Sequence, residues 1–435
     1  MSVRAPGLVA YVNARLLDPA SGLDAKGGLL TDGEKIVEVG AGLFSTGVPD
    51  GAEVIDCAGA CLAPGLVDMR VQLREPGEEH KESLRSAGEA AVAGGVTSMV
   101  CLPNTQPAID DVATVEFVAR RARQIGLAKV YPYAAATKGL AGAEMSEIGL
   151  LSKAGALAFT DGTRAIRDAQ VMRRALAYAA TFGVLIVQHP EEPSLAGGGA
   201  MNEGELSTRL GLAGIPAAAE AIMLERDLRL VELTGGRYHA AHVSTAEAVA
   251  LIRRAKDRGL PVTCDTAPPY FALNELAVSE YRTFAKLSPP LRSEADRQAI
   301  VAGLRDGVID TIASDHAPQD QDSKRLPFAQ AETGGVGLET LLPVTLELYH
   351  NGHLTLLQAI GKLSFAPARL LGLPAGQLQA GAAADLLLFD PDHPWRITPE
   401  DFRSKSKNSP FDGRPVQGRV LRTVVDGRTV FSAEV

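Results

Sequence analysis

The sequence predicts an α/β protein whose central part is a (β/α)8 barrel of the TIM type and whose two ends form one small β-rich domain. Two observations predict the barrel. Apolar runs of strand length alternate with amphipathic runs of helix length through the middle of the chain, and almost every strand candidate there ends in a polar or ionisable residue. A third observation predicts the second domain, because short strands punctuated by Gly and Asp occur at both ends of the chain.

The two β-rich ends are expected to share one sheet. Their strand candidates are residues 8–18, 27–40 and 52–60 near the start, and 383–390 and 418–431 near the finish. The Asp426-Gly427 dipeptide is typical of a two-residue hairpin turn. We therefore place the small domain in residues 1–62 and 376–435 and the barrel in residues 63–375. Separate terminal sheets are the alternative.

The middle of the chain contains eight strand candidates and the helices that connect them. The strand candidates are 62–73, 96–105, 129–137, 156–162, 184–190, 237–245, 260–269 and 309–318. Helical patterns cover 81–95, 114–126, 168–183, 246–259 and 294–307, and each of them ends in Gly, a common helix stop. Eight strands that alternate with helices fit a closed barrel better than an open sheet. The longest irregular stretch is 190–216.

Composition excludes several classes of function. The 435 residues carry 43 basic and 52 acidic side chains, a net charge of −9, without a Lys/Arg cluster, so neither nucleic acid nor an anionic membrane is expected as main partner. No apolar run approaches the roughly 18 residues of a membrane span. The four cysteines form no CxxC pair and have no flanking base, so we expect a reducing cytoplasm and no cysteine nucleophile.

Four strand ends carry residues that could hold a metal: Asp161, His189, His242 and Asp315. Imidazole and carboxylate groups that converge at the carboxyl ends of barrel strands can bind a divalent ion such as Zn²⁺. Such an ion acidifies water, and a free carboxylate beside it can carry protons during amide hydrolysis. The alternative is that each residue caps a helix or makes a hydrogen bond in the core.

A resemblance to a known family covers nearly the whole chain. The segments that carry it are 63–82 (APGLVDMRVQLREPGEEHKE), 101–111 (CLPNTQPAIDD), 158–162, 201–223, 236–245, 286–300, 312–318 (IASDHAP), 334–343 and 407–413. They resemble the dihydroorotases of the amidohydrolase superfamily. The resemblance implies a (β/α)8 barrel plus a β-sandwich built from both termini. It also implies the reversible cyclisation of carbamoyl aspartate to dihydroorotate in pyrimidine synthesis.

The first barrel strand departs from this family. Its members carry His-x-His there, two ligands of the first metal, whereas this chain has Arg70 and Gln72. Arginine has no acceptor and keeps its proton, so it cannot bind a cation. We expect Arg70 to replace the charge of the first metal and to pair with Asp161 or Asp315.

The resemblance assigns roles to the four strand-end residues. Asp161 matches the carboxylate that bridges the two metals, and His189 and His242 match ligands of the second metal. Asp315 matches the catalytic acid/base. We therefore expect at most one divalent metal, Zn²⁺ at the second position, or none.

Several substrate contacts are altered as well. Arg74 and Asn104 match residues that hold the substrate carboxylate. Gln319 stands where the family has a His, and Ser288 where it has an Asn beside the substrate ring. The run 267–270, Ala-Pro-Pro-Tyr, replaces Thr-Pro-His-His.

Three functions follow, in decreasing order of weight. The first is a catalytically defective homologue that serves as a structural or regulatory partner of aspartate carbamoyltransferase, as some members of the family do. The second is an active dihydroorotase that uses one metal held by Asp161, His189 and His242. The third is a hydrolase of another hydantoin- or ureide-like substrate.

A homodimer is expected, since dimers are common in the family. His239 and His316 are expected to point away from the site, and residues 196–199 to form a loop at the barrel mouth.

Overall fold

The computed structural model describes residues 7–433 and has an α/β fold with parallel sheets in the middle of the chain. One sheet contains β6 (Leu66–Val71), β7 (Val96–Cys101) and β8 (Lys129–Pro132). The other contains, in spatial order, β16 (Thr311–Ile312), β15 (Val262–Thr266), β14 (Arg237–Ala240), β11 (Leu185–Gln188), β10 (Ala158–Thr160) and β9 (Ala134–Ala135). Every predicted strand segment of the middle contains a strand. Hydrogen bonding divides them into two parallel sheets rather than one closed ring.

The five predicted helices are confirmed. They are α1 (Leu84–Ala93), α2 (Val112–Ile125), α4 (Ala169–Phe182), α8 (Ala246–Asp257) and α10 (Glu294–Arg305). Each begins after a Ser, Thr or Asp whose side chain accepts a hydrogen bond from a backbone N–H of the first turn. As expected, α2 and α4 end at Gly126 and Gly183, both in the left-handed conformation.

The sequence patterns missed several helices. The longer ones are α3 (Ile148–Lys153), α7 (Ala218–Thr234), α12 (Leu341–His350), α13 (Leu356–Leu363) and α14 (Phe365–Leu371). In α7 the buried face includes Glu220 and Asp227, which interrupts the apolar stripe by which a surface helix is recognised. In α12 seven of ten residues are buried, so the helix has little amphipathic contrast.

Short elements complete the middle of the chain. The irregular stretch 190–216 contains α5 (Pro193–Ala196), β12 (Met201–Asn202), α6 (Glu205–Leu210) and β13 (Gly214–Ile215). Elsewhere lie α9 (Pro268–Ala272), α11 (Gln321–Lys324) and the 3-10 turns Lys138–Leu140, Glu275–Val278, Thr283–Ala285 and Pro399–Asp401.

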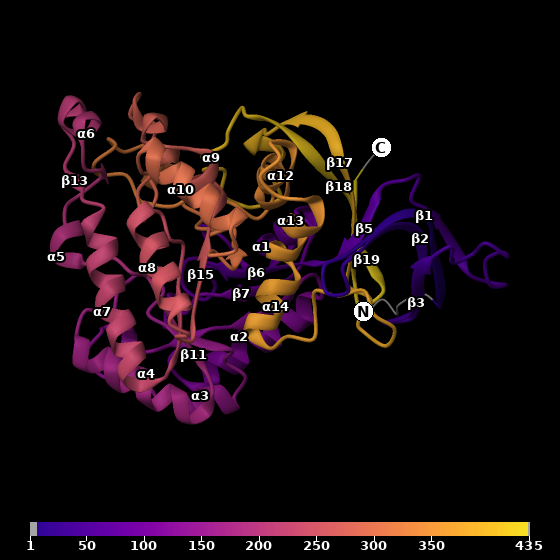
Figure 1. The fold of residues 1–435 in the computed structure, drawn as a ribbon, viewed down its shortest axis with the longest axis horizontal. Coiled ribbons are helices and arrows are strands. Elements are labelled where there is room, and N and C mark those ends of the chain that lie inside the picture. Colours follow the sequence, from indigo (N-terminus) through magenta and orange to yellow (C-terminus); the bar gives the residue numbers. More distant parts are fainter. Residues whose placement is uncertain (1–6, 434–435) are drawn as a thin grey trace.

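Both ends of the chain share one eight-stranded sheet, as predicted (Figure 1). Its order is β19 (Arg428–Ser432), β18 (Pro415–Val425), β17 (Leu386–Arg396), β5 (Cys61–Pro64), β1 (Leu8–Asp18), β2 (Leu23–Asp32) and β3 (Lys35–Ala41), with β4 (Glu53–Asp56) paired to β1. The antiparallel pair β17–β5 joins the C-terminal strands to the N-terminal ones. The β18–β19 hairpin turns at Asp426 and Gly427, which both have positive φ.

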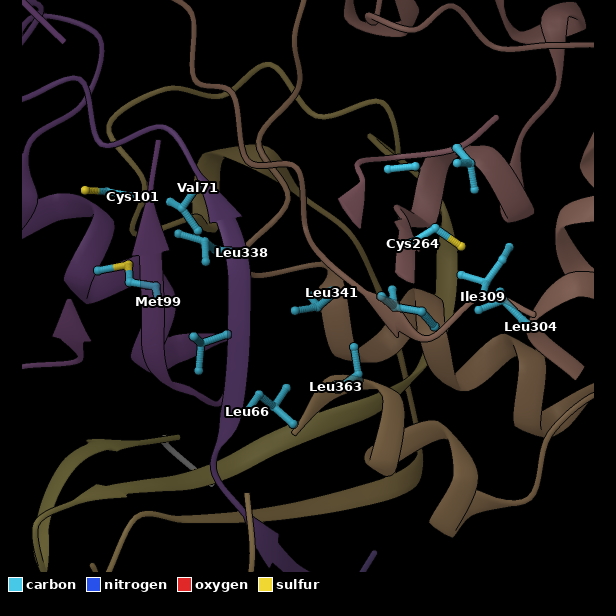
Figure 2. Close-up of a cluster of buried hydrophobic side chains, with 14 of the residues drawn as sticks. Leu66, Val71, Met99, Cys101, Cys264, Leu304, Ile309, Leu338, Leu341 and Leu363 are labelled. Atoms are coloured by element: carbon cyan, nitrogen blue, oxygen red, sulfur yellow. The ribbon is translucent and has the colours of Figure 1, made fainter. Parts of the chain in front are cut away.

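One large apolar core lies between the parallel strands and the helices that cover them. In Figure 2, Leu66 and Val71 of β6 lie in the same cluster as Leu341 of α12 and Leu363 of α13. The terminal sheet has a separate small core that includes Tyr11. Within the part of the chain that the structure describes, no helix is both long and apolar enough to cross a membrane.

A partly buried ion pair ties the terminal sheet to the parallel strands. Lys129 at the start of β8 places its Nζ 2.7 Å from both Asp385 Oδ2 and Asp426 Oδ1. The Asp385 side chain is 8% exposed, and its Oδ1 accepts a hydrogen bond from the backbone N–H of Asp426. The pair therefore fixes the β18–β19 turn against β8.

We predict that Asp385→Ala lowers the free energy of unfolding by about 1–3 kcal/mol, because it removes one of the two carboxylates that pair with Lys129 and leaves the backbone N–H of Asp426 without its acceptor. Urea denaturation of the variant and wild type measures the change. Asp392→Ala, which removes a carboxylate whose side chain is 74% exposed, is the control and should change little. Equal effects of the two substitutions would contradict the role of Asp385.

Candidate active site

A polar cavity of about 340 Å³ opens where residues that follow the parallel strands converge. Eight of the ten site residues predicted from the sequence line it: Arg70, Gln72, Arg74, Asn104, His189, Ser288, Asp315 and Gln319. The other two, Asp161 and His242, are buried and do not line it. The cavity volume is in the range of small-molecule sites.

Arg70 pairs with Asp315 and not with Asp161. Its Nε lies 2.8 Å from Asp315 Oδ1, and its Nη2 donates to the carbonyl oxygen of Gly162 at 3.3 Å. The two side chains are 3% and 16% exposed, so water screens the pair weakly. Burial raises the pKa of the Asp315 carboxyl, and the Arg70 charge opposes that rise. The Arg70–Asp315 contact is therefore compatible with the expectation that Arg70 replaces the positive charge of the first metal.

His189 and His242 face each other. Nδ1 of His189 lies 3.1 Å from Nε2 of His242, and their ring centroids are 4.9 Å apart. Burial lowers the pKa of His242 well below its usual value, and the charges of Arg70 and His189 lower it further. His242 is therefore neutral, and one neutral ring can donate a hydrogen bond to the other. Two nitrogens of one tetrahedral Zn²⁺ would stand about 3.3 Å apart, so the spacing also suits a shared ion.

The third expected ligand, Asp161, is hydrogen-bonded to Thr137. Its two oxygens accept hydrogen bonds from the backbone N–H and the hydroxyl of Thr137, at 2.9 and 2.6 Å. Among residues 7–433 no three His, Cys, Asp or Glu side chains are grouped so that they could hold a metal. The Arg70 cation beside His242 would also repel a divalent ion. The residues present do not fit the metal centre that the family resemblance implies.

Three further polar residues of the cavity, Gln72, Arg74 and Gln319, make hydrogen bonds within the protein. Gln72, at the position of a missing His, accepts a hydrogen bond from the amide of Asn104 at 3.0 Å. Arg74 donates to Glu78 at 2.8 Å and to the carbonyl of Pro318 at 3.2 Å. Gln319 donates its amide N–H to Thr333, while its Oε1 is buried and has no partner among the described residues.

Two buried carboxylates support these side chains from behind. Asp68 Oδ1 accepts from the backbone N–H groups of Arg70 and Ser314, so it joins β6 to the segment that carries Asp315. Asp265 accepts from the backbone N–H of His242 at 2.6 Å and from the His239 ring at 2.8 Å. Consistent with expectation, His239 does not line the cavity.

Three residues of the site have left-handed backbone conformations. Arg74, His242 and Asp315 have φ of 60°, 37° and 49°. Such a conformation costs about 1–3 kcal/mol for a residue with a side chain, and it persists where surrounding contacts hold it. Here Asp265 holds the backbone of His242.

Sequence reasoning did not single out Asp68, Thr137 or Glu191. Asp68 had a signal, because it is a carboxylate inside the strand β6, whose other residues apart from Arg70 are apolar. Glu191 lies 3.6 Å from the Nε2 of His189, and both line a neighbouring cavity of about 410 Å³. Gly197 of the glycine-rich loop also lines that second cavity.

The other expected structural histidine, His316, is buried, and its Nδ1 accepts from the N–H of Gly337.

The fold places the chain in a class, the amidohydrolase superfamily. The L-hydantoinase (dihydropyrimidinase) from Arthrobacter aurescens has a similar structure, with a TM-score of 0.86 and 27% identity, over 98% of this chain and 96% of that one. Relatives by sequence are named dihydroorotase. The proteins of Wolbachia sp. subsp. Drosophila simulans (strain wRi) and Anaplasma phagocytophilum (strain HZ) are each 48% identical over 98% of this chain and 96% of their own length. A family model described as Dihydro-orotase-like matches residues 59–248.

The chain belongs to the dihydroorotase family. Within that family it carries Arg70 and Gln72 in place of the first-strand His-x-His.

A buried lysine supports one wall of the cavity. Lys324 is 2% exposed, and its Nζ donates to the carbonyl of Glu332, a residue that lines the cavity. Burial, helped by the charge of Lys286, lowers its pKa from 10.5 to about 7. Between these two pH values the unfolded chain binds more protons than the folded one, so this group makes stability rise with pH.

We predict that Lys324→Met reduces the gain in unfolding free energy between pH 7 and pH 9 by about 1–2 kcal/mol. Urea denaturation at the two pH values measures it. Lys153→Met, at an exposed lysine, is the control and should leave the pH dependence as in wild type. The prediction fails if both variants keep the wild-type slope.

Proposed function

We propose that this protein binds carbamoyl aspartate and dihydroorotate and catalyses their interconversion, the dihydroorotase reaction. One observation carries the proposal. A small polar cavity with Arg74, Asn104 and Asp315 on its wall lies in a chain that is 48% identical to proteins named dihydroorotase over almost its full length.

The side chains of the cavity suit a small anionic ureide. Arg74 is a guanidinium, and Asn104 supplies amide N–H donors, so together they can hold the substrate carboxylate. Ser288 and Gln319 line the same cavity and offer a hydroxyl and an amide to the ring.

Asp315 is the candidate acid/base. It lines the cavity, and burial raises the pKa of its carboxyl while the Arg70 charge opposes the rise. A carboxyl at this position can accept and return a proton. In ring opening it would take a proton from the attacking water and return it to the leaving nitrogen. No step is assigned to a metal, since Asp161, His189 and His242 do not form a complete ligand set.

The proposal includes the architecture. The two parallel sheets are two parts of one (β/α)8 barrel over residues 63–375. Its support is that β8 and β9 are separated only by Tyr133, and that an isolated parallel bridge joins Val71, the last residue of β6, to His316 after β16. Residues 1–62 and 376–435 form a β-sandwich domain.

A second candidate is a structural or regulatory role beside aspartate carbamoyltransferase, with little turnover. The Arg70–Asp315 pair favours it, because the ion pair engages one oxygen of the acid/base carboxylate. The comparisons give no support for this partner, so it takes second place.

We predict that purified protein turns over dihydroorotate and that Asp315→Asn lowers kcat at least about 10²-fold, because the proton carrier is lost. Absorbance of the ring amide follows turnover, and calorimetry follows dihydroorotate binding, which the variant should retain. Asp322→Asn, at an exposed carboxylate of α11, is the control. A wild-type protein without turnover that forms a stable complex with aspartate carbamoyltransferase in gel filtration would favour the second candidate instead.

A further inference from the structure

A second cation lies beside Arg74 on the cavity wall. Lys81 lines the cavity of about 340 Å³ together with Arg74 and Glu78. The side chains of Arg74, Lys81 and Glu78 are 8%, 14% and 22% exposed. Charges that are shielded from bulk water in this way attract an anion more strongly than charges on the open surface do. Lys81 is therefore placed, by its depth and its position, to act on an anion in the cavity.

The loop after β6 brings the three side chains together. The backbone N–H of Glu78 donates to the carbonyl of Arg74 at 2.8 Å, and the backbone N–H of Lys81 donates to the carbonyl of Glu78 at 2.9 Å. The hydroxyl of Ser406, 325 residues away in the chain, donates to the carbonyl of Lys81 at 2.7 Å. The backbone of Lys81 is thus fixed by tertiary structure and not only by its own loop.

One carboxylate serves both cations. Oε2 of Glu78 accepts from Nη1 of Arg74 at 2.8 Å, and Oε1 accepts from Nζ of Lys81 at 2.6 Å. Burial raises the pKa of Glu78, but the hydrogen bond from Lys81 and the charge of Arg74 hold that pKa below its ordinary value. Glu78 is therefore ionised, and the three side chains together keep one uncompensated positive charge. Glu332, an exposed carboxylate of the same cavity, forms no ion pair with them among residues 7–433.

Donors of both cations are left for a ligand. The Lys81 ammonium has three N–H groups and makes one hydrogen bond within residues 7–433. Arg74 donates through Nε to Pro318 and through Nη1 to Glu78, whereas its Nη2 makes no hydrogen bond within the described chain and is not a buried atom. Both side chains line the cavity, so a ligand that enters it can reach these donors.

We propose that Lys81 is a further substrate-binding residue, which binds the carboxylate of dihydroorotate and of carbamoyl aspartate together with Arg74. This inference rests on the proposed function and adds a second cation to its carboxylate subsite. Glu78 holds the two cations side by side, and its own carboxylate shows that a group of this size can bridge them. With a ligand carboxylate in place, two cations meet two carboxylates and the cluster has no net charge.

The two-cation subsite determines specificity. It favours a ring that carries a carboxylate over the same ring without one, since a neutral ring leaves the positive charge unpaired. Dihydrouracil is the probe for this difference, because it is dihydroorotate with a hydrogen in place of the carboxylate. One hydrogen bond to a charged group typically changes an affinity about 10- to 100-fold.

The test compares wild type with Lys81→Met and Lys81→Arg. We expect Lys81→Met to raise the dissociation constant and the KM of dihydroorotate about 10- to 100-fold, with kcat within about threefold of wild type, because the contact is equal in the ground and transition states. Lys81→Arg should regain most of the affinity, since it keeps the charge and the N–H donors. Calorimetry measures dihydroorotate binding. Binding of dihydrouracil, followed by ligand-observed NMR, should be the same in all three proteins.

Lys138→Met is the matched control, because Lys138 also pairs with a glutamate, Glu144, but does not line the cavity. Its affinity for dihydroorotate should equal that of wild type, and circular dichroism melts verify that each variant is folded. A folded Lys81→Met protein with wild-type affinity for dihydroorotate would overturn the inference, as would an equal loss for dihydroorotate and dihydrouracil, which indicates a distorted cavity. A wild type that binds dihydroorotate through Lys81 without turnover would support the inference and overturn the proposed activity, so the two failures are distinct.

Discussion

The site is organised around one buried ion pair, Arg70–Asp315. A guanidinium that is 3% exposed must have a counter-charge, because an unpaired buried cation is strongly unfavourable. Asp315 supplies that charge from a segment 245 residues away in the chain. The pair therefore holds the first and last parallel strands of the middle region together at their carboxyl ends. It also places a positive charge where the family resemblance implies a metal, and this charge adds to the burial that lowers the pKa of the neighbouring His242.

The polar groups around that pair are hydrogen-bonded within the protein. Asp68 accepts hydrogen bonds from the backbone of Arg70 in β6 and of Ser314 in the segment that carries Asp315. Burial raises the pKa of Asp68 to about 6. Gln72 pairs with Asn104, and Asp161 is engaged by Thr137. Residues that could have bound a metal are thus hydrogen-bonded within the protein. Among residues 7–433, Arg70 Nη1 and Gln319 Oε1 are buried and have no hydrogen-bond partner.

Strand-end reasoning predicted much of the site because parallel strands bring their carboxyl ends to one place. It therefore placed His189 and Asp315 at one site, although they are far apart in sequence, and the family resemblance added Arg70 and Asn104. It did not foresee Thr137, since a threonine at a strand end has no distinctive pattern. The helix α7 was missed because Glu220 and Asp227 occupy its buried face, where they bind backbone and side-chain donors of the neighbouring strands. Periodicity detects apolar faces, and a buried carboxylate breaks the pattern.

The sequence by itself determined the class of fold, the sheet shared by both ends, the family, and the replacement of two histidines by Arg70 and Gln72. Each of these depends on residue types and their local order. Only the tertiary structure decided that Arg70 pairs with Asp315 and not Asp161, that His189 faces His242, and that Asp161 turns to Thr137. The physical reason is that each choice is a competition between partners on different strands. It is settled by distance and burial, which local sequence does not encode.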